Sequence, residues 1–325
     1  MRTSEFDYEL APERIAQVPV EPRDSSRLLD TRDHSDHRFA DLADLLEPGD
    51  VVVVNRSRVR AARLGGVKTA TGGKVEALLL GPLTDDRWRA MIRPARRLRA
   101  GTTLEFGPIT AIVEERPTEG VAILHLMAEG DLEEAIARVG TVPLPPYIAA
   151  DLADPERYQT IFAREIGSAA APTAGLHFTE EVVARLQERR VETVAVELRV
   201  GLDTFRPIST DQIEDHQIHS EEFSIPESTR QAIKECRGRV VAVGTTVVRA
   251  LESDPEQSST SLFISPGFEF KTVDLLVTNF HLPRTSLLVL LAAFMGSAWR
   301  ETYEIAMKRN YRFASFGDAM LAERR

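Results

Sequence analysis

The sequence predicts an α/β protein, with a large mixed α/β domain and a smaller inserted β-barrel domain. Three observations support this fold class. After the turn Pro48-Gly49, Asp50–Asn55 reads DVVVVN, a continuous apolar run typical of a strand buried on both faces. From about Ala61, short strands follow one another between glycines, which is typical of a small antiparallel barrel or sandwich. After Ala150, strands and helices alternate, which favours a largely parallel sheet.

The inserted barrel is predicted over residues 61–149, so the α/β domain is discontinuous, over 1–60 and 150–325. Asp131 is expected to cap a helix, DLEEAIARVG, and Pro143–Ile148 (PLPPYI) to form a rigid linker that leaves the barrel. The barrel strands are expected at Lys74–Leu80, Arg87–Arg93, Thr102–Phe106, Ile109–Glu115 and Val121–Met127.

The α/β domain is expected to continue as alternating helices and strands. Helices are predicted at Glu180–Arg190, Glu227–Cys236, Val247–Ser253 and Ser286–Met295. Strands are predicted at Thr193–Val200, Arg239–Val243 and Thr272–Thr278. Because side chains alternate along a strand, the first of these divides into two faces: Val194, Val196, Leu198 and Val200 on one, Ala195, Glu197 and Arg199 on the other.

Composition excludes several classes of protein. A chain of 325 residues that is 43% hydrophobic and 28% charged can bury a sizeable core in two domains. No apolar run approaches the ~20 residues that a membrane span needs, so no membrane association is expected. Cys236 is the single cysteine, which excludes an internal disulfide and favours the reducing cytoplasm. The net charge of −10 argues against a general nucleic-acid coat.

One segment departs from this acidic average. Between Arg56 and Arg99 there are twelve lysines and arginines but only three acidic residues. Clustered arginines are the electrostatic pattern expected for binding a phosphate backbone, although strand faces paired with the acidic remainder would also account for it. The candidate RNA-binding residues are Arg56, Arg58, Arg93, Arg96 and Arg97.

The segment Glu165–Glu180, EIGSAAAPTAGLHFTE, is the strongest candidate for a site. Its small residues let a backbone approach a ligand closely, and it carries a lone histidine, His177, directly before a helix that Thr179 is expected to cap. A tight connection with a structural histidine is the alternative for such a loop taken alone. The candidate substrate-binding residues here are Thr173, Ala174 and Gly175.

Further candidates lie at strand-to-helix edges, where open α/β sheets bind ligands. Val243–Thr246 (VGTT) opens a helix whose free N–H groups can bind a carboxylate or phosphate, although ordinary N-capping also explains the threonines. Thr278–Pro283 (TNFHLP) contributes Asn279 and His281, and Arg199–Pro207 leaves the strand that carries Glu197. The chain lacks the motifs of P-loop, nicotinamide-binding and α/β-hydrolase proteins.

The segment Asp215–Glu222 (DHQIHSEE) raises the alternative of a metal site. His216 and His219, with Glu221 or Glu222, are ligands that zinc or iron accepts. The segment lacks the paired-histidine helix of a zincin, and its apolar flanks favour an edge segment. No metal site is therefore predicted.

Seven specific segments occur in one order along the chain: FDYELAPERIAQVPVEPRDSSRLL, PLPPYI, ERYQTIFARE, APTAGLHFTEE, VGTTVVRALES, FISPGFEFKTVDLLVTNFHLPRTSLL and YRFASFGDAML. In these segments the chain resembles the S-adenosylmethionine:tRNA ribosyltransferase-isomerase family of queuosine biosynthesis along nearly its whole length.

The resemblance implies an α/β domain with an inserted β-barrel, in agreement with the patterns above. It implies an enzyme that uses S-adenosylmethionine as a ribosyl donor and co-substrate, and the 7-aminomethyl-7-deazaguanine precursor in tRNA as acceptor. The products would be epoxyqueuosine in tRNA, adenine and methionine. No true cofactor and no metal is implied, and the chain is expected to act as a monomer.

The chemistry requires a base that deprotonates the 5′ carbon beside the sulfonium, an acid that assists adenine departure, and donors that stabilise changing charge. His177, Glu197 and His281 are the expected catalytic residues. The expected substrate-binding residues are Thr173, Ala174 and Gly175 for the nucleoside, Arg206, Gly244, Thr245 and Thr246 for the methionine carboxylate, Asn279 for adenine or the acceptor base, and Arg199 beside Glu197.

The chain departs from the family pattern beside Glu197. Arg199 stands where histidine is expected and Asp203 where glycine is expected, and the two are either a compensating ion pair or the mark of a changed acceptor. A paralogue that uses a small-molecule acceptor and a non-catalytic RNA-binding protein are therefore the alternatives. A methyltransferase is disfavoured because the glycine-rich first strand–helix turn is absent.

Overall fold

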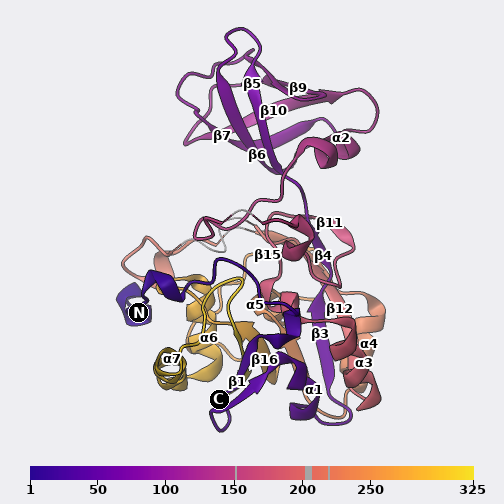
Figure 1. The fold of residues 1–325 in the computed structure, drawn as a ribbon, viewed down its shortest axis with the longest axis vertical. Helices are drawn as coiled ribbons and strands as arrows, with labels where there is room; N and C mark the ends of the chain where they lie inside the picture. Colours follow the sequence, from indigo (N-terminus) through magenta and orange to yellow (C-terminus); the bar gives the residue numbers. More distant parts are fainter. Residues whose placement is uncertain (151, 202–206, 219) are drawn as a thin grey trace. The chain divides into compact units, whose positions relative to one another are not determined.

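The computed structural model describes residues 1–150, 152–201, 207–218 and 220–325. The chain forms two compact units (Figure 1): one comprises Met1–Arg58 and Pro145–Arg325, and the other Val59–Leu144. The first unit is built on a mixed sheet covered by helices, and the second is a closed β-barrel, which confirms the predicted fold class. None of the described helices combines the length and apolar character that a membrane crossing requires.

The large unit is organised around one sheet. The described residues contribute nine strands in the order β15 (Ser259–Thr260), β13 (Glu221–Ser224), β12 (Glu192–Leu198), β3 (Val51–Asn55), β14 (Val240–Val243), β16 (Leu275–Asn279), β17 (Ala319–Glu323), β1 (Arg27–Asp30) and β2 (Ser35–Arg38). The four central strands β12, β3, β14 and β16 are parallel. β17 runs antiparallel to β16, and β1 runs parallel to β17.

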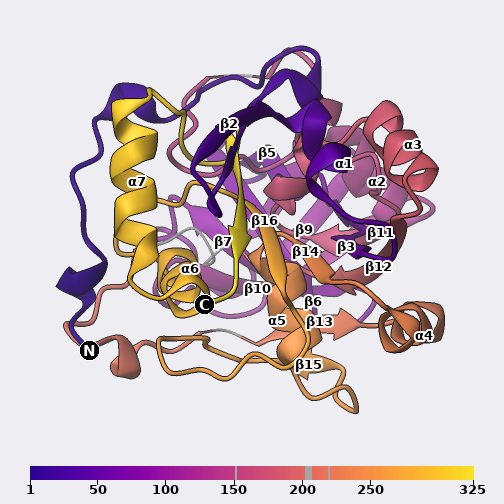
Figure 2. The same cartoon turned by 90° about the horizontal axis from the view of Figure 1, so that it is seen from below.

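Helices cover both faces of this sheet (Figures 1 and 2). On one face α1 (Leu42–Leu45) and α3 (Glu180–Glu188) share a core with Val52 and Val54. On the other face α5 (Thr245–Glu252), α6 (Ser286–Met295) and α7 (Ala298–Lys308) share a core with Val51 and Val53. The unbroken valine run of β3 follows from this arrangement, because both faces of the strand are buried. α4 (Glu227–Glu235) packs against β12 and β3.

The barrel unit contains one strand that the sequence analysis missed. Its closed order is β10 (Val121–Ala128), β7 (Arg87–Arg93), β6 (Lys74–Pro82), β5 (Arg63–Lys68), β8 (Thr103–Phe106) and β9 (Ile109–Val113), with α2 (Leu132–Val139) following. The missed strand, β5, contains two glycines, and the sequence analysis interpreted these glycines as breaks between strands. Gly66 is needed there because a Cβ at this position would lie 2.1 Å from the carbonyl oxygen of Glu105.

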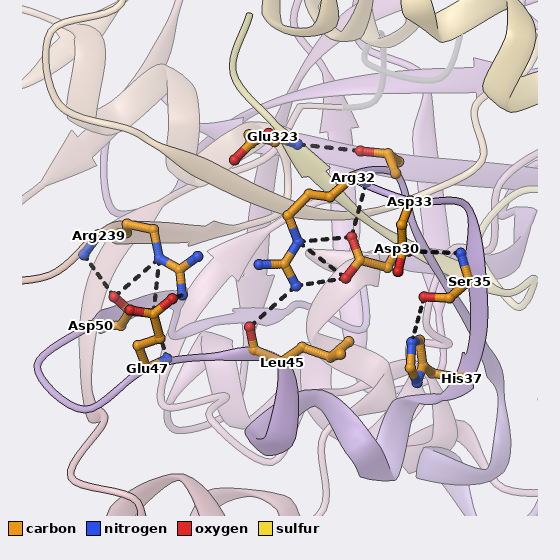
Figure 3. A network of polar contacts seen from close by, with 11 residues as sticks. Asp30, Arg32, Asp33, Ser35, His37, Leu45, Glu47, Asp50, Arg239 and Glu323 are labelled. Atoms are coloured by element: carbon orange, nitrogen blue, oxygen red, sulfur yellow. Dashed lines mark hydrogen bonds and ion pairs between the residues drawn. The ribbon is translucent and has the colours of Figure 1, made fainter.

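The strand directions define two edges of the large sheet. The carboxyl ends of β12, β3, β14 and β16 lie at one edge, together with the amino ends of the antiparallel strands β17 and β1. At the opposite edge, Figure 3 shows Asp30 bound by Arg32 and Asp50 bound by Arg239, each with a shortest contact of 2.6 Å. The Asp50 side chain is 1% exposed, so its ion pair with Arg239 is buried at this opposite edge. Open α/β sheets bind ligands at the carboxyl ends of their parallel strands, which lie at the first edge.

Candidate active site

Three separate segments converge at the carboxyl edge of the sheet. The 3₁₀-helix η6 (Thr173–His177) lies against the ends of β16 and β14. The Thr173 hydroxyl donates to Asn279 Oδ1 at 3.2 Å, and the Asn279 amide nitrogen lies 3.0 Å from His177 Nε2. A Cβ added to Gly244, at the end of β14, would lie 3.6 Å from Ala174 Cβ. The structure therefore brings together predicted residues that are far apart in the sequence.

His177 is a buried, neutral imidazole. Its Nδ1 lies 2.7 Å from the Ser26 hydroxyl, and its ring stacks on Phe39 with centroids 4.9 Å apart. Burial lowers the pKa of His177 to about 4, although the nearby Asp318 carboxylate acts in the opposite direction. Because the Asn279 amide nitrogen can only donate, Nε2 is the acceptor and Nδ1 carries the proton that is donated to Ser26.

His281 lies in a small pocket beside this network. The pocket has an enclosed space of about 20 Å³ and is lined in part by Thr173, Asn279, His281 and Leu287. Burial lowers the pKa of His281 to about 3, and its Nε2 lies 3.1 Å from the Thr278 hydroxyl. A neutral histidine and an amide therefore face a pocket at the end of β16, the position expected for a ligand site.

Two tyrosines fix the main chain of His281. The Tyr8 hydroxyl donates to its carbonyl oxygen at 2.5 Å, and the Tyr303 hydroxyl accepts from its N–H at 2.9 Å. On another wall of the pocket, the Tyr147 and Ser315 hydroxyls lie 2.7 Å apart. The pocket is thus lined by segments that are far apart in the sequence, from Tyr147 to Ser315, and an amino-terminal residue, Tyr8, holds the main chain of one of its lining residues.

Glu197 and Arg199 lie on a different strand from this pocket. Three strand spacings of about 4.8 Å separate β12 from β16, so about 14 Å lies between the two strands. Glu197 accepts from Arg56 Nε at 2.9 Å, and Arg199 pairs with Glu222 at 2.5 Å. The structure therefore does not bring Glu197 into hydrogen-bond contact with His177. Asp203, the expected partner of Arg199, lies outside the described residues.

The VGTT segment forms the start of α5. Thr245 begins the helix, so the turn predicted at Gly244–Thr246 is its first helical turn, and Gly244 is the N-cap with φ +92°. Thr245 and Thr246 line a second, very small pocket, whose enclosed space is about 10 Å³. Arg206, expected beside them, lies outside the described residues.

The candidate RNA-binding arginines fall into two groups. Arg56 pairs with Glu197, and Arg58 pairs with Glu156 at 2.5 Å, both within the large unit. The barrel residues Arg93, Arg96 and Arg97 are exposed. Over the whole barrel unit, twelve lysines and arginines face eleven acidic residues, most of which follow Arg99 in the sequence. The barrel unit therefore has almost no net charge, because its basic residues lie mostly before Arg99 in the sequence and its acidic residues mostly after it.

The DHQIHSEE segment is used for packing and ion pairs. Glu221 pairs with Arg249 and Glu222 with Arg199, while the His216 ring lies edge-on to Phe263. His219 lies outside the described residues. Among the residues that the structure does describe, no group of three potential ligands is placed to hold a metal ion.

Several residues around His177, His281 and the pocket were missed by the sequence analysis: Ser26, Phe39, Tyr8, Tyr303, Ser315 and Asp318. Ser26 and Asp318 directly precede β1 and β17, whose amino ends lie at the site edge. A signal was present, because both occur in quoted segments, PRDSSRLL and FASFGDAML. Their proximity to His177 depends on strand directions that those segments do not encode.

Comparisons with known proteins agree on one family. The family model described as "Queuosine biosynthesis protein" matches residues 3–322. The chain is 51% identical over 344 residues to the S-adenosylmethionine:tRNA ribosyltransferase-isomerase of Anaeromyxobacter sp. (strain Fw109-5), covering 100% of this chain and 99% of the relative. It is 47% identical over 340 residues to the protein of the same name from Moorella thermoacetica, covering 99% of each.

A solved structure extends the comparison. The crystal structure of S-adenosylmethionine tRNA ribosyltransferase from Thermotoga maritima matches with a TM-score of 0.54 and 39% identity, over 98% of this chain and 99% of that one. The expected resemblance is thereby confirmed over the full length. The chain belongs to the queuosine biosynthesis family.

Proposed function

We propose that this chain is an S-adenosylmethionine:tRNA ribosyltransferase-isomerase. It transfers and isomerises the ribosyl moiety of S-adenosylmethionine onto 7-aminomethyl-7-deazaguanine in tRNA, giving epoxyqueuosine and releasing adenine and methionine. The observation that carries this proposal is the match of about 50% identity over whole chains to relatives of that name. The paralogue and the non-catalytic RNA-binding protein are not favoured, because the match spans the complete catalytic relatives.

The reaction begins at the sulfonium, which acidifies the 5′ carbon so that a base can remove its proton. The electron pair left at the 5′ carbon forms a double bond to the 4′ carbon, the ring oxygen leaves the 4′ carbon and becomes the oxygen of an aldehyde at the 1′ carbon, and the bond to adenine breaks, assisted by protonation of the departing ring. The neutral acceptor amine adds to the 4′ carbon, and the carbanion regenerated beside the sulfonium closes a five-membered carbon ring on the aldehyde carbon. The resulting alkoxide then displaces methionine from the 5′ carbon and forms the epoxide. A water-poor pocket with fixed donors and acceptors favours each charge change.

The geometry of the carboxyl edge supports specific roles. A neutral His177 can accept a proton, so we propose that it acts as the base. Its hydrogen-bond network with Asn279 and Thr173 holds it in place. Asn279 and His281 line the same pocket and are assigned to the adenine or the acceptor base. Ala174 and Gly175, in the same 3₁₀-helix, are proposed to wall the nucleoside.

The remaining residues are assigned to the outer part of the site. We propose that Glu197 and Arg199 contact the substrates from β12, since the donor and the acceptor together can span several strands. Gly244, Thr245 and Thr246 at the start of α5, with Arg206, are proposed to bind the methionine carboxylate. Arg93, Arg96 and Arg97 are proposed to contact tRNA phosphates.

The proposal includes no metal and no redox cofactor, with S-adenosylmethionine as co-substrate only. A monomer acting on tRNA in the cytoplasm is the corresponding proposal for assembly and location.

The decisive experiment is incubation of the purified chain with S-adenosylmethionine and precursor-bearing tRNA, followed by mass spectrometry. Adenine, methionine and epoxyqueuosine are expected to accumulate together. Binding of S-adenosylmethionine without formation of modified tRNA would reject this function and direct the search to small-molecule acceptors.

A further inference from the structure

The pocket that contains Asn279 and His281 has one wall to which the proposed function assigns no role. That wall includes Tyr147 and Ser315, whose hydroxyl oxygens lie 2.7 Å apart. Tyr147 belongs to the PLPPYI segment, for which the sequence analysis expected only a linker. The structure places this tyrosine in the lining of the candidate site as well.

The main chain around both residues is fixed. The Gln17 side chain donates to the Tyr147 carbonyl oxygen at 2.9 Å. Directly before Ser315, Ala314 has a φ of +69°, and its N–H donates to the Phe280 carbonyl oxygen at 3.0 Å. An alanine in this left-handed region is strained, and such strain gathers at functional sites. The strained turn thus sets the position of Ser315 beside Tyr147.

The enclosed part of the pocket has the size of a single polar group. Its space of about 20 Å³ is room for about one water-sized group. A nucleobase or a sugar ring must therefore lie at the mouth, and it can insert only one atom such as an oxygen. Phe280, Leu282 and Leu287 contribute apolar walls, which strengthen a hydrogen bond made between them.

The two hydroxyls are suited to donate to such an atom. The threonines of the lining donate within the protein, Thr173 to Asn279 and Thr285 to a main-chain oxygen. The hydrogen bond between Tyr147 and Ser315 uses one of their two hydroxyl protons, and the pair can donate the other to an oxygen in the pocket. Burial raises the pKa of the Tyr147 phenol above its ordinary value, although contacts with Ser315 act in the opposite direction. The phenol therefore keeps its proton at neutral pH.

The proposed reaction contains one oxygen that needs a donor at two stages. When the ribose ring opens, the electron pair of the bond to the 4′ carbon moves to the ring oxygen, which forms the aldehyde as the bond to adenine breaks. When the carbon ring closes, the pair of the aldehyde double bond moves to the same oxygen and makes it an alkoxide. A fixed donor whose hydrogen bond strengthens as this charge develops lowers both barriers.

We propose that the Tyr147–Ser315 hydroxyl pair donates a hydrogen bond to the ribose ring oxygen of S-adenosylmethionine, and to the same oxygen in the aldehyde and the alkoxide. No proton is transferred in this role, so the alkoxide keeps the electron pair with which it displaces methionine. Tyr147 and Ser315 are thereby catalytic residues in addition to those assigned above. This inference rests on the proposed function for the identity of the oxygen.

The test is the variant Tyr147→Phe, assayed with S-adenosylmethionine and precursor-bearing tRNA. We expect kcat to fall about 100-fold, the order of effect for the loss of one oxyanion donor. The KM and the calorimetric dissociation constant for S-adenosylmethionine are expected to change less than about threefold, since the bond strengthens only in the transition state. Ser315→Ala is expected to lower kcat similarly, and the double variant no further, because the two hydroxyls act as one unit.

Tyr311→Phe is the matched control. It also removes a buried tyrosine hydroxyl, but the partner of that hydroxyl, Asp36, lies outside the pocket lining and stays paired with Arg27 and Arg309. We expect this variant to keep its kcat, and thermal unfolding checks that every variant is folded at the assay temperature. A fall of kcat equal to that of Tyr147→Phe would indicate a general loss of structure and overturn the inference.

The outcomes separate this inference from the proposed function. Formation of modified tRNA at near wild-type kcat by folded Tyr147→Phe overturns the inference alone, and Ser315→Ala decides in the same way if that variant does not fold. Adenine release that both variants slow, without modified tRNA from the wild type, overturns the proposed function alone. A wild type that releases no adenine overturns both.

Discussion

At the scale of single residues, the candidate site depends on two histidines that burial keeps neutral. His177 is fixed by Ser26, Asn279 and the stacked ring of Phe39, whereas His281 is held through its main chain by two tyrosines. Burial lowers their pKa values to about 4 and about 3, so both imidazoles are neutral at neutral pH and neither carries a second proton before the reaction begins.

The first prediction concerns replacement of His177. We expect His177→Ala to lower kcat by about 100-fold or more, the usual range for loss of a general base. His177→Gln keeps a hydrogen-bond acceptor for Asn279, and is expected to retain more of the substrate affinity while losing a similar factor in kcat. Single-turnover measurements of adenine release test this. Near-normal turnover in His177→Ala would remove the residue from the mechanism.

The second prediction concerns stability against pH. Both histidines have folded pKa values below the unfolded value of 6.5, so the unfolded chain binds protons first as the pH falls. Their contribution is complete above pH 6.5 and is lost progressively between pH 6.5 and the folded pKa values of about 4 and about 3. Each contributes a slope of about 1.4 kcal/mol per pH unit inside its window.

Urea unfolding between pH 4.5 and 7.5, a range chosen to span roughly that window, measures this slope. We expect His281→Gln to reduce it by about 1.4 kcal/mol per pH unit relative to the wild type. An identical slope in the variant and the wild type would contradict the neutral, buried state of His281.

At the scale of elements, the site is assembled from the ends of strands and the starts of helices. The start of α5 illustrates how local geometry is constrained, because Gly244 has φ +92° and ψ 151°, a conformation that is essentially restricted to glycine. This conformation turns the chain from β14 into α5 while leaving the first N–H groups of the helix uncapped.

The third prediction follows from this constraint. Gly244→Ala is expected to destabilise the large unit by roughly 1–3 kcal/mol and to weaken binding of S-adenosylmethionine, because the backbone at the start of α5 must shift. Gly201→Ala is the control. Its added Cβ would meet Glu221 Oε1 at 3.5 Å, an ordinary contact, and the residue has no left-handed φ. Denaturant unfolding compares the two variants, and equal effects would contradict the argument.

At the scale of the whole molecule, charge is distributed unevenly along an acidic chain. The barrel unit is nearly balanced, with its arginines concentrated before Arg99 and its acidic residues mostly after it. Arg93, Arg96 and Arg97 are exposed, and no ion pair is found for them among the described residues. They are therefore among the exposed cations of the barrel that are available to bind phosphates.

The fourth prediction tests this charge arrangement. Arg96→Ala and Arg97→Ala are each expected to weaken tRNA binding and to reduce the slope of log affinity against log salt by roughly 0.7–0.9. Arg116→Ala is the matched control, because it makes the same charge change at an exposed position outside the cluster. Filter binding or fluorescence anisotropy at several salt concentrations measures the slope. Equal reductions in all three variants would indicate only a general effect of net charge.

The fold class and most of the candidate residues could be predicted from the sequence. Hydrophobic periodicity predicted the strand at Asp50–Asn55, the barrel strands other than β5 and the helix starts, because the residues of each element show which of its faces is buried. Motif order identified the family, and the small residues before His177 marked the loop. β5 was missed because one of its glycines, Gly66, allows a close approach to β8, which only the partner strand reveals.

Which of these residues lie in contact could not be predicted, because it depends on how the strands are ordered in the folded protein. Strand order places His177, Asn279 and Ser26 together, although 151 and 102 positions separate Ser26 and Asn279 from His177 in the sequence. The same order sets Glu197 three strands away, despite its place in an equally suggestive segment. The protonation state of both histidines also depends on the tertiary structure, because their pKa values depend on burial and on neighbours from distant segments. Sequence patterns encode what each element prefers, whereas contacts across the sheet arise only when all elements pack together.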